Sequence, residues 1–268
     1  MTRRGPASLP ASLVVGIALV LQGCAGLVGV KDSIETPAGT PPRAPAPMAD
    51  GSVQIEKGRP GLVIAAPHGT SDAATDVMGR DLARLTGFGL VVVTGYTRVD
   101  AVGRRYNVNR PTESVPGAPA RQEVETDAAR SVYQSYRRQV AEAAQGPLRL
   151  YVEVHGNAGE ASASRMEIAT VGVSREDAWR LKALLEMIRD ARLPADGAVP
   201  RLDVWMEPQD QLVYGASTAK EKGILGQAGL ALHIELPRAA RTAHRDAYTT
   251  VLADFLIQSA ALLLPATR

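Results

Sequence analysis

The amino-acid sequence predicts an α/β fold: a single three-layer domain in which helices cover both faces of a mixed, mostly parallel sheet. Strand-like apolar runs alternate with helix-patterned segments along the chain. Hydrophobic residues make up 45% of the chain but aromatic residues only 4%, and such an aliphatic core suits parallel strands that are buried on both faces. We expect strands at residues 62–66, 90–94, 148–154, 166–171, 202–205 and 230–236.

Three segments carry helical patterns. Ser174 and Asp177 look like a capping box for a helix that runs through Leu184 and Ile188. A last helix is expected from about Thr242, with a buried stripe near its middle. Between residues 122 and 144 apolar side chains recur at every fourth position, which places them on one helix face; they are Val124, Ala128, Val132, Tyr136 and Val140.

The N-terminus has the layout of a secretory signal. Arg3 and Arg4 precede a short apolar run, residues 13–21, which is too short to span a membrane. The following Leu21-Gln22-Gly23-Cys24 resembles a bacterial lipoprotein signal. This resemblance implies that residues 1–23 are removed, that Cys24 is lipidated, and that a lipid anchor holds the protein in the cell envelope, at the periplasmic face of the outer membrane. Cys24 is the only cysteine of the chain, which excludes an intrachain disulfide.

A proline-rich segment follows Cys24. With few large apolar residues it cannot bury enough surface to fold, so we expect residues 24–58 to form a tether and residues 59–268 to form one catalytic domain. The net charge of +2 is equal to the contribution of Arg3 and Arg4, so the chain without its leader is neutral. This balance argues against nucleic acid as a partner.

Polar residues interrupt the apolar pattern at three places. Pro67-His68-Gly69, with Asp72 shortly after, follows the run at 62–66. Glu153 and His155 share one face of the strand expected at 148–154, and His233 and Glu235 share one face of the strand expected at 230–236. Burying acids among Val, Leu and Ile is costly unless they are paired or bind a metal.

A catalytic zinc site needs three protein ligands and an open position for water. His68, Asp72 and His155 could supply the three ligands, and a nearby carboxylate, for which Glu235 is our candidate, could move the proton. Each residue also has a simpler interpretation. Asp72 or Ser71 could cap the helix that follows, and a lone histidine in a strand is more often a hydrogen-bonded structural residue.

The order of these motifs, with Asn109-Arg110-Pro111 between them, resembles the N-formylglutamate amidohydrolase-like proteins, which are relatives of the zinc carboxypeptidases. The resemblance spans about residues 60–240. It implies that His68, Asp72 and His155 hold zinc and that Glu235 is the catalytic acid. It also implies that Asn109 and Arg110 bind the substrate carboxylate, with Arg104 or Arg105 as a helper.

The sequence departs from the family pattern in two ways. The spacing between His68 and the following acid differs from that of the relatives, so Asp76, one helical turn beyond Asp72, is an alternative ligand. The family often has Asp where this chain has Glu153, whose longer side chain could orient His155 or bind the metal itself. The resemblance assigns no role to His233, which we place beside the metal ligands.

These observations predict a zinc-dependent hydrolase that cleaves an amide bond next to a free carboxylate, in an acyl-amino acid, a γ-glutamyl compound or a cell-wall peptide. Two alternatives stay open. One is an N-acetylmuramoyl-L-alanine amidase, although the Pro before His68 differs from the Gly usual in that family. The other is a metal-free binding lipoprotein of the envelope.

Overall fold

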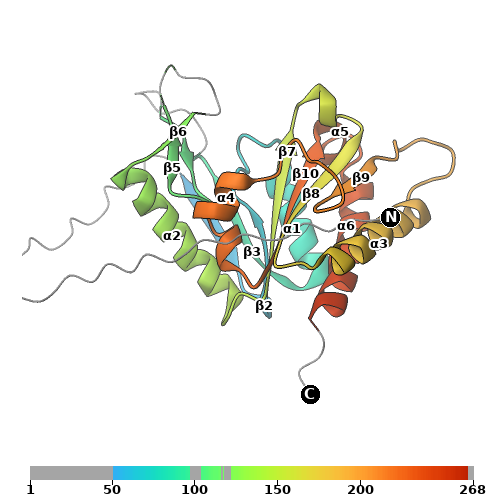
Figure 1. Ribbon diagram of the computed structural model, residues 1–268, viewed down its shortest axis with the longest axis horizontal. Helices are drawn as coiled ribbons and strands as arrows, with labels where there is room; N and C mark the ends of the chain where they lie inside the picture. The colour runs from blue at the N-terminus through green and yellow to red at the C-terminus, as the bar shows by residue number, and fades with distance from the viewer. Residues whose placement is uncertain (1–50, 97–103, 116, 118–121, 265–268) are drawn as a thin grey trace, which may run out of the picture. The chain divides into compact units, whose positions relative to one another are not determined.

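A mixed seven-stranded sheet is the centre of the part of the chain that the computed structural model describes, residues 51–96, 104–115, 117 and 122–264 (Figure 1). These residues all belong to one compact unit, 44–268. The strand order is β1-β3-β2-β7-β10-β8-β9. The strands are β1 (Ser52–Glu56), β2 (Arg59–Ala66), β3 (Phe88–Thr94), β7 (Leu150–Asn157), β8 (Arg165–Val171), β9 (Asp203–Met206) and β10 (Leu230–Pro237).

The middle of the sheet is parallel. β3, β2, β7 and β10 run in the same direction, whereas β1 pairs antiparallel with β3 and β8 pairs antiparallel with β10. Each run that the sequence predicts as a strand lies in this sheet, and the predicted α/β class is confirmed. Because the central strands are parallel, their carboxyl ends meet at one edge, where ligands of open α/β sheets gather.

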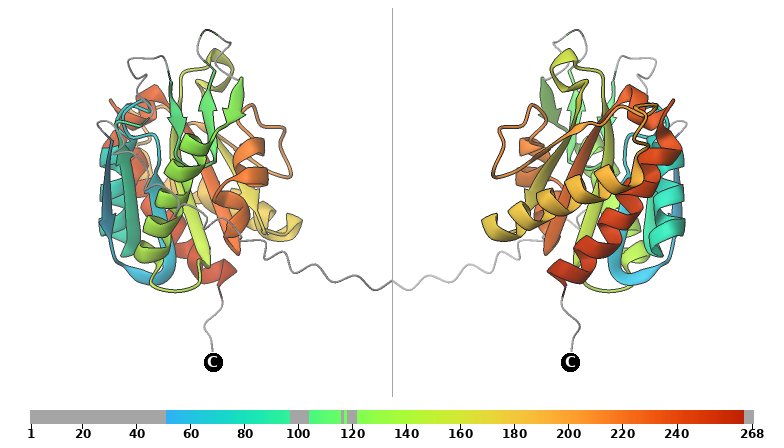
Figure 2. Two further views of the ribbon diagram at one scale, coloured as in Figure 1. Left: turned by 90° about the vertical axis from the view of Figure 1, so that its left-hand side faces the viewer. Right: turned by 90° about the vertical axis from the view of Figure 1, so that its right-hand side faces the viewer.

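Helices cover both faces of the sheet, as predicted. α1, α3 and α6 pack on one face, and the views in Figure 2 show α3 and α6 lying together there. α2 and the short α4 pack on the other face. Along β7, Leu150, Val152 and Val154 point toward the face covered by α1, α3 and α6, while Tyr151 points toward α2. The helices are α1 (Thr75–Thr86), α2 (Asp127–Ala144), α3 (Arg175–Arg192), α4 (Ser217–Lys222), α5 (Arg238–Arg241) and α6 (Arg245–Leu263).

The helix boundaries follow local chemistry. Ser174 caps α3, because its hydroxyl accepts the backbone N–H of Asp177 at 3.0 Å, as the capping box predicts. α6 buries Val251, Leu252, Phe255 and Leu256, the stripe expected from the sequence. Short 3-10 turns lie at Glu160–Ser162 and Leu225–Gln227. In the described ranges, none of the helices is both long and apolar enough to span a membrane.

The predicted helix at residues 122–144 is wrong over its first turn. α2 begins at Asp127, after Thr126 accepts the N–H of Ala129 with its hydroxyl at 3.1 Å. The preceding residues form a strand of a small second sheet instead, and Val124 is exposed. This sheet has the order β4-β5-β6, with β4 at Tyr106–Asn107, β5 at Thr112–Ser114 and β6 at Glu123–Glu125.

The expected tether ends earlier than residue 58. β1 pairs with β3 from Ser52 to Glu56, and Val53 and Ile55 pack partly buried against the core under α2. The sequence hides this strand because it is short and directly follows the proline-rich segment. Cys24 and the signal-like residues lie outside the described residues.

We expect a chain that begins at residue 59 to be less stable than one that begins at residue 44. Removing β1 exposes the edge of β3 and takes away the partial burial of Val53 and Ile55, worth about 2–4 kcal/mol for two aliphatic side chains. Urea unfolding of both chains measures the difference in unfolding free energy. Equal unfolding midpoints would contradict a structural role for β1.

Candidate metal and catalytic site

The site residues converge at the carboxyl edge of the parallel strands. His68 follows β2, while His155 lies near the end of β7 directly opposite Glu235 of β10. His233 lies opposite Glu153 one step earlier in the same pairing. His68, His155, His233 and Glu235 all line one hollow of about 1170 Å³, including its open mouth. Segments about 80 residues apart in the sequence thus contribute to one pocket.

A tight turn after β2 carries Asp72 back toward the histidines. The N–H of Asp72 donates to the carbonyl of His68 at 2.9 Å, and Thr75 donates to the carbonyl of Asp72 at 3.0 Å. The residue before α1 is Ala74, in the left-handed region at φ 65° and without a side-chain cap. The interpretation of Asp72 or Ser71 as a helix cap is therefore wrong.

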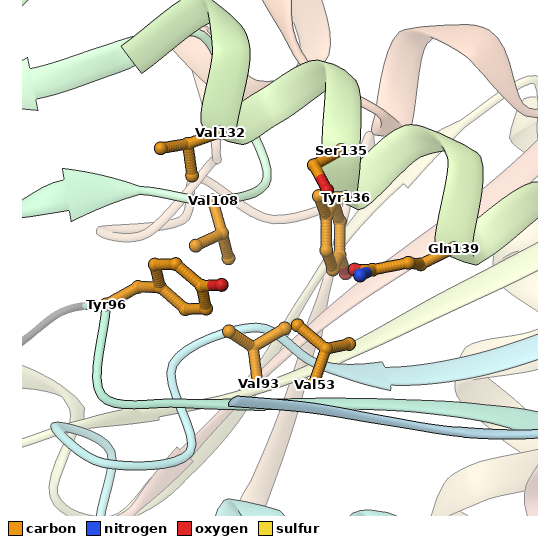
Figure 3. Close-up of a pocket in the computed structure, with 8 residues that line it drawn as sticks. All are labelled: Val53, Val93, Tyr96, Val108, Val132, Ser135, Tyr136 and Gln139. Atoms are coloured by element: carbon orange, nitrogen blue, oxygen red, sulfur yellow. The ribbon is translucent and has the colours of Figure 1, made fainter. Parts of the chain in front are cut away.

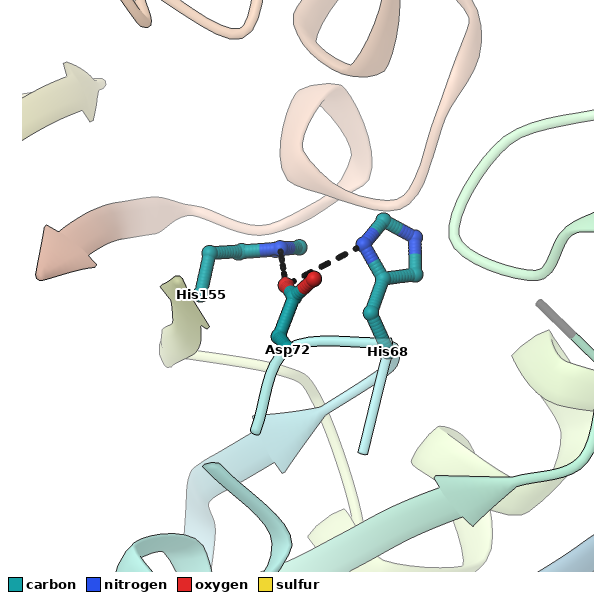
Figure 4. A group of neighbouring side chains, drawn as sticks. All are labelled: His68, Asp72 and His155. Atoms are coloured by element: carbon teal, nitrogen blue, oxygen red, sulfur yellow. Dashed lines mark ion pairs between the residues drawn. The ribbon is translucent and has the colours of Figure 1, made fainter. Parts of the chain in front are cut away.

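The Asp72 carboxylate lies between two imidazole rings (Figure 4). Its Oδ2 is 3.5 Å from Nδ1 of His68 and 3.4 Å from Nδ1 of His155. The same oxygen accepts the backbone N–H of Gly156 at 3.2 Å. Asp76, the alternative ligand, points elsewhere and accepts a hydrogen bond from Arg80 at 2.9 Å. The structure therefore brings Asp72, not Asp76, together with the histidines.

The spacing of these donor atoms fits a metal ion. Ligand atoms about 2.0–2.2 Å from a tetrahedral zinc lie roughly 3.3–3.6 Å from one another. The distances of 3.4 and 3.5 Å fall in that range, whereas a charge-assisted hydrogen bond is shorter, about 2.7–2.9 Å. His68, Asp72 and His155 could therefore hold a metal ion together.

The electrostatics of the three residues differ. Burial lowers the pKa of His68 below its ordinary value, which leaves a neutral ring with a lone pair to offer. Burial alone would raise the pKa of Asp72, but the imidazoles of His155 and His68 outweigh it and hold that pKa well below its usual range. Burial likewise opposes the charged form of His155, yet Asp72 and Glu153 raise its pKa to about 10. A metal at Nδ1 of His155 therefore competes with a proton.

Glu153 is the centre of a buried hydrogen-bond network. Its Oε1 accepts from the hydroxyl of Tyr151 at 3.0 Å, and its two oxygens lie 3.2 and 3.0 Å from Nδ2 of Asn109. Its Oε2 is 3.1 Å from both Nε2 of His155 and Nδ1 of His233. These partners hold the pKa of Glu153 well below its usual range although burial opposes it. Glu153 thus orients His155 so that Nδ1 faces Asp72, the arrangement typical of carboxylate–histidine–metal sites.

A second set of residues, Glu153, His155 and His233, also clusters closely enough to hold a metal ion. Glu153 is fully buried and does not line the pocket, so a metal there would lack the open position that catalysis needs. Its oxygens already accept from Tyr151 and Asn109 as well as from the histidines. We therefore infer that Glu153 and His233 orient His155 and do not hold a metal ion themselves.

His233 connects Glu153 to Glu235. Its Nε2 lies 3.3 Å from Oε1 of Glu235, while its ring lies against that of His155, with ring centres 4.2 Å apart. The other oxygen of Glu235, Oε2, is buried and has no hydrogen-bond partner among the described residues. Glu235 is thus held at one oxygen and has no partner at the other among the described residues, and its side chain lines the pocket.

The arginines of residues 104–110 differ in their partners and in their position relative to the pocket. Arg110 lines the pocket, but its Nε donates to Oε2 of Glu123 at 2.8 Å and its second amino group pairs with Oε1 of the same carboxylate. Asn109 is buried on Glu153 and does not line the pocket. Arg104 stacks over the ring of Tyr106 at 5.8 Å and does not line it either. Arg105 does line the pocket, and its buried Nε has no partner within the described part of the chain.

Three supporting residues escape the sequence patterns. Glu123 lines the pocket from β6. Arg241 is buried, and its guanidinium donates to the carbonyls of Leu236 at 3.1 Å and Asn157 at 3.2 Å, and to that of Ala73. Gly156 makes room for it, because a Cβ there would lie 2.1 Å from the guanidinium carbon. Arg241 thereby ties the ends of β10 and β7 to the turn that carries Asp72, a role without a signal in one sequence.

Glu167 of β8 holds the rim of the pocket. Its buried carboxylate accepts the backbone N–H groups of Val213 and Tyr214 at 2.8 and 2.9 Å, together with the side chains of Ser162 and Arg165. Residues 213–219 line the pocket, in the Gly-, Ala- and Ser-rich segment 210–222. The hydroxyl of Tyr214 lies close to Gly159, where a Cβ would be 2.6 Å away.

A smaller hollow of about 190 Å³ lies between α2 and the strands β1 and β3 (Figure 3). Valine and tyrosine side chains form most of its lining, with Ser135 and Gln139 from α2. This lining offers no set of groups for acid–base or metal chemistry, so we assign the chemistry to the histidine-lined pocket.

Comparisons with known proteins find only distant similarity. No protein-family model and no curated protein matches the sequence. A bacteriophage poly-gamma-glutamate hydrolase aligns over 79% of this chain and 88% of its own, with a TM-score of 0.46 and 11% identity. A metallo-carboxypeptidase from Burkholderia cenocepacia aligns over 81% of this chain and 66% of its own, with a TM-score of 0.40 and 13% identity. A gene product from Agrobacterium tumefaciens aligns over 79% of this chain and 94% of its own, with a TM-score of 0.39 and 16% identity. Likeness at this level assigns no activity, which rests on the side chains described above.

We expect Glu167→Gln to destabilise the protein in a pH-dependent way. Burial opposes the charged form, but hydrogen bonds from Tyr214, Ser162, Arg165 and Val213 lower the pKa of Glu167 below 4.5. The stabilisation is therefore present above pH 4.5 and is lost as the pH falls through the lowered pKa. Urea unfolding at pH 7 should show a loss of about 1–3 kcal/mol for Glu167→Gln.

The difference between the wild type and Glu167→Gln should shrink below pH 4.5. Glu142→Gln, a change of an exposed acid on α2, is the matched control and should leave the unfolding free energy nearly unchanged. A Glu167→Gln effect that stays constant with pH would contradict the ionised, hydrogen-bonded carboxylate.

Proposed function

We propose that this protein is a zinc-dependent hydrolase that cleaves an amide bond next to a free carboxylate. The observation that carries the proposal is the pair of 3.4 and 3.5 Å distances between Asp72 and the two Nδ1 atoms, which match the edges of a zinc tetrahedron. A carboxylate with an unpartnered oxygen, Glu235, lines the same pocket. A metal-dependent hydrolase needs three protein ligands, a coordination position left for water, and a nearby carboxylate that moves the proton.

His68, Asp72 and His155 would hold the ion through Nδ1, Oδ2 and Nδ1. A zinc ion at such a site supplies Lewis-acid polarisation of a carbonyl and lowers the pKa of water. Glu153 keeps Nε2 of His155 engaged at 3.1 Å, which leaves Nδ1 directed at the metal position. Gly156 steadies the second ligand by donating its N–H to Asp72.

Glu235 moves the proton in this proposal. Its Oε2 takes the proton from the attacking water and then delivers it to the nitrogen of the leaving group. His233 holds Oε1 at 3.3 Å, so the carboxylate keeps one orientation while the other oxygen works. Residues 213–219 line the same pocket as Glu235.

Arg105 replaces Arg110 as the residue that we propose to bind the substrate carboxylate. A guanidinium binds a carboxylate through two parallel N–H groups, and Arg110 already uses this geometry on Glu123. Arg105 has a buried, unpartnered Nε in the pocket wall, as far as the described residues show. Leaving such a donor unsatisfied costs about 1–3 kcal/mol, which a substrate oxygen would recover.

The location that we propose rests on the sequence alone. Cys24 would carry the lipid after removal of residues 1–23, and a tether that ends near residue 51 would hold the enzyme on the periplasmic face of the outer membrane. Substrates there include cell-wall peptides and γ-glutamyl compounds, so a substrate screen should contain both, with muropeptides to test the amidase alternative.

We expect the protein to bind a single equivalent of zinc and Asp72→Asn to weaken that binding at least roughly 100-fold, because it removes one of three ligands. Competition with a chromophoric chelator at pH 7 measures the affinity. Asp76→Asn is the matched control and should bind zinc like the wild type. A wild type without stoichiometric zinc would favour a metal-free binding protein, and a larger loss in Asp76→Asn would reassign the ligand.

Glu235→Gln should lower kcat on any amide substrate found by the screen by roughly 10²–10⁴-fold, because the variant cannot take up the proton. KM and zinc affinity should change little, since Glu235 is not a ligand in this proposal. Glu160→Gln, an exposed acid at the 3-10 turn after β7, serves as the control. Full activity in Glu235→Gln would remove Glu235 from the catalytic role.

A further inference from the structure

The charged residues of the pocket wall indicate which groups a substrate carries at the end that does not react. The pocket is lined by the three candidate metal ligands, by His233 and by Glu235. Its other charged lining residues are two cations, Arg105 and Arg110, and one anion, Glu123. The charge of Arg110 is one of the causes that lower the pKa of His68, and His68 is one of the groups that lower the pKa of Glu123, so both residues lie near this metal-ligand candidate.

Arg110 and Glu123 form a pair that is held from several directions. Nε of Arg110 donates to Oε2 of Glu123 at 2.8 Å, and Nη1 donates to Oδ1 of Asn109 at 3.1 Å. Thr112 also donates to Oε2 of Glu123 at 2.8 Å. The side chains of Arg110 and Glu123 are 18% and 19% exposed. Each nitrogen of the Arg110 guanidinium thus has a partner, while the Glu123 side chain lines the pocket.

Arg105 differs from Arg110 in this respect. It lines the same pocket, and its buried Nε has no partner in the described ranges. The wall therefore offers a cation that lacks a partner at one donor and an anion that is already ionised. Both are neighbours of Ser114 in β5, which donates its backbone N–H to the carbonyl of Arg105 and pairs with Glu123 of β6. A carboxylate oxygen has more than one lone pair, so Glu123 can accept a further hydrogen bond from a ligand cation without releasing Arg110.

We propose that the pocket selects substrates whose bound end is an amino-acid head group with both a free carboxylate and a free ammonium group. Arg105 binds the carboxylate, Glu123 binds the ammonium, and Arg110 is a positioning residue that holds Glu123. This inference rests on the proposed function, because it names the substrate class of the same pocket. It favours γ-glutamyl or similar cell-wall compounds over acyl-amino acids, whose acylated nitrogen would offer Glu123 no ammonium group.

Binding of three small probes tests the selection without relying on catalysis. Glutamate carries the ammonium, N-acetylglutamate carries an acylated nitrogen, and glutarate carries none. By isothermal titration calorimetry with the zinc-loaded full chain, glutamate should bind about 10- to 100-fold more tightly than the other two, the worth of one charged hydrogen bond. Equal or tighter binding of N-acetylglutamate or glutarate overturns the proposal.

Variants assign the recognition to residues. Glu123→Gln should reduce glutamate binding to the level of N-acetylglutamate and leave the affinity for the other two probes nearly unchanged. Arg105→Gln should weaken all three. A merely structural role of Glu123 would weaken all three probes alike, which also overturns the proposal. Glu125→Gln, in the same strand but paired with Lys222 at 2.7 Å, is the matched control.

Failure of this inference differs from failure of the proposed function. If the zinc-loaded protein hydrolyses acyl-amino acids and does not bind glutamate preferentially, the head-group selection is wrong while the hydrolase function stands. If the protein holds no zinc, hydrolyses none of the screened amides and binds none of the probes, both are wrong.

Discussion

The burial of one carboxylate, that of Glu153, is the constraint on which the rest of the site depends. A charge without solvent in the middle of a sheet is tolerated only when donors surround it. Tyr151, Asn109, His155 and His233 provide them. Satisfying Glu153 therefore sets the orientation of His155, seats His233 beside Glu235, and pins the segment that leads to Arg110.

The two faces of β7 and β10 have different roles: one face builds the core, and the other carries the candidate site residues. On β7 and β10 the residues that alternate toward α1, α3 and α6 are aliphatic and build the larger core, including Val152, Val154, Leu232 and Ile234. The residues in between point toward α2 and the pocket and carry the acids and histidines. Because neighbouring strands pair in register, His155 and Glu235 meet without any help from loops. The Asp72 turn, the rim held by Glu167, and the wall with Arg105 and the β6 residue Glu123 complete the pocket.

Much of the fold and part of the site could be predicted from the sequence because periodicity is a local signal. The long apolar strands and the helices α3 and α6 are where the pattern puts them, and the polar residues that interrupt the strands are the ones that line or support the pocket. β1 was missed because a strand of five residues after a proline-rich segment has little pattern of its own. Residues 123–125 were assigned to a helix because a fourfold apolar spacing continues into them, whereas pairing with β5 decides their conformation.

The sequence by itself determined which residues could do chemistry, since acids and histidines on one face of buried strands are too costly to lack partners. Only the tertiary structure decided how they are combined. The left-handed residue Ala74 lets the chain turn so that Asp72, and not Asp76, reaches the histidines. The second sheet brings Glu123 to Arg110, so this arginine is paired with a carboxylate, whereas Arg105 lines the same pocket with an Nε that has no partner among the described residues. Such choices depend on distances between segments remote in the chain, and no local pattern encodes those distances.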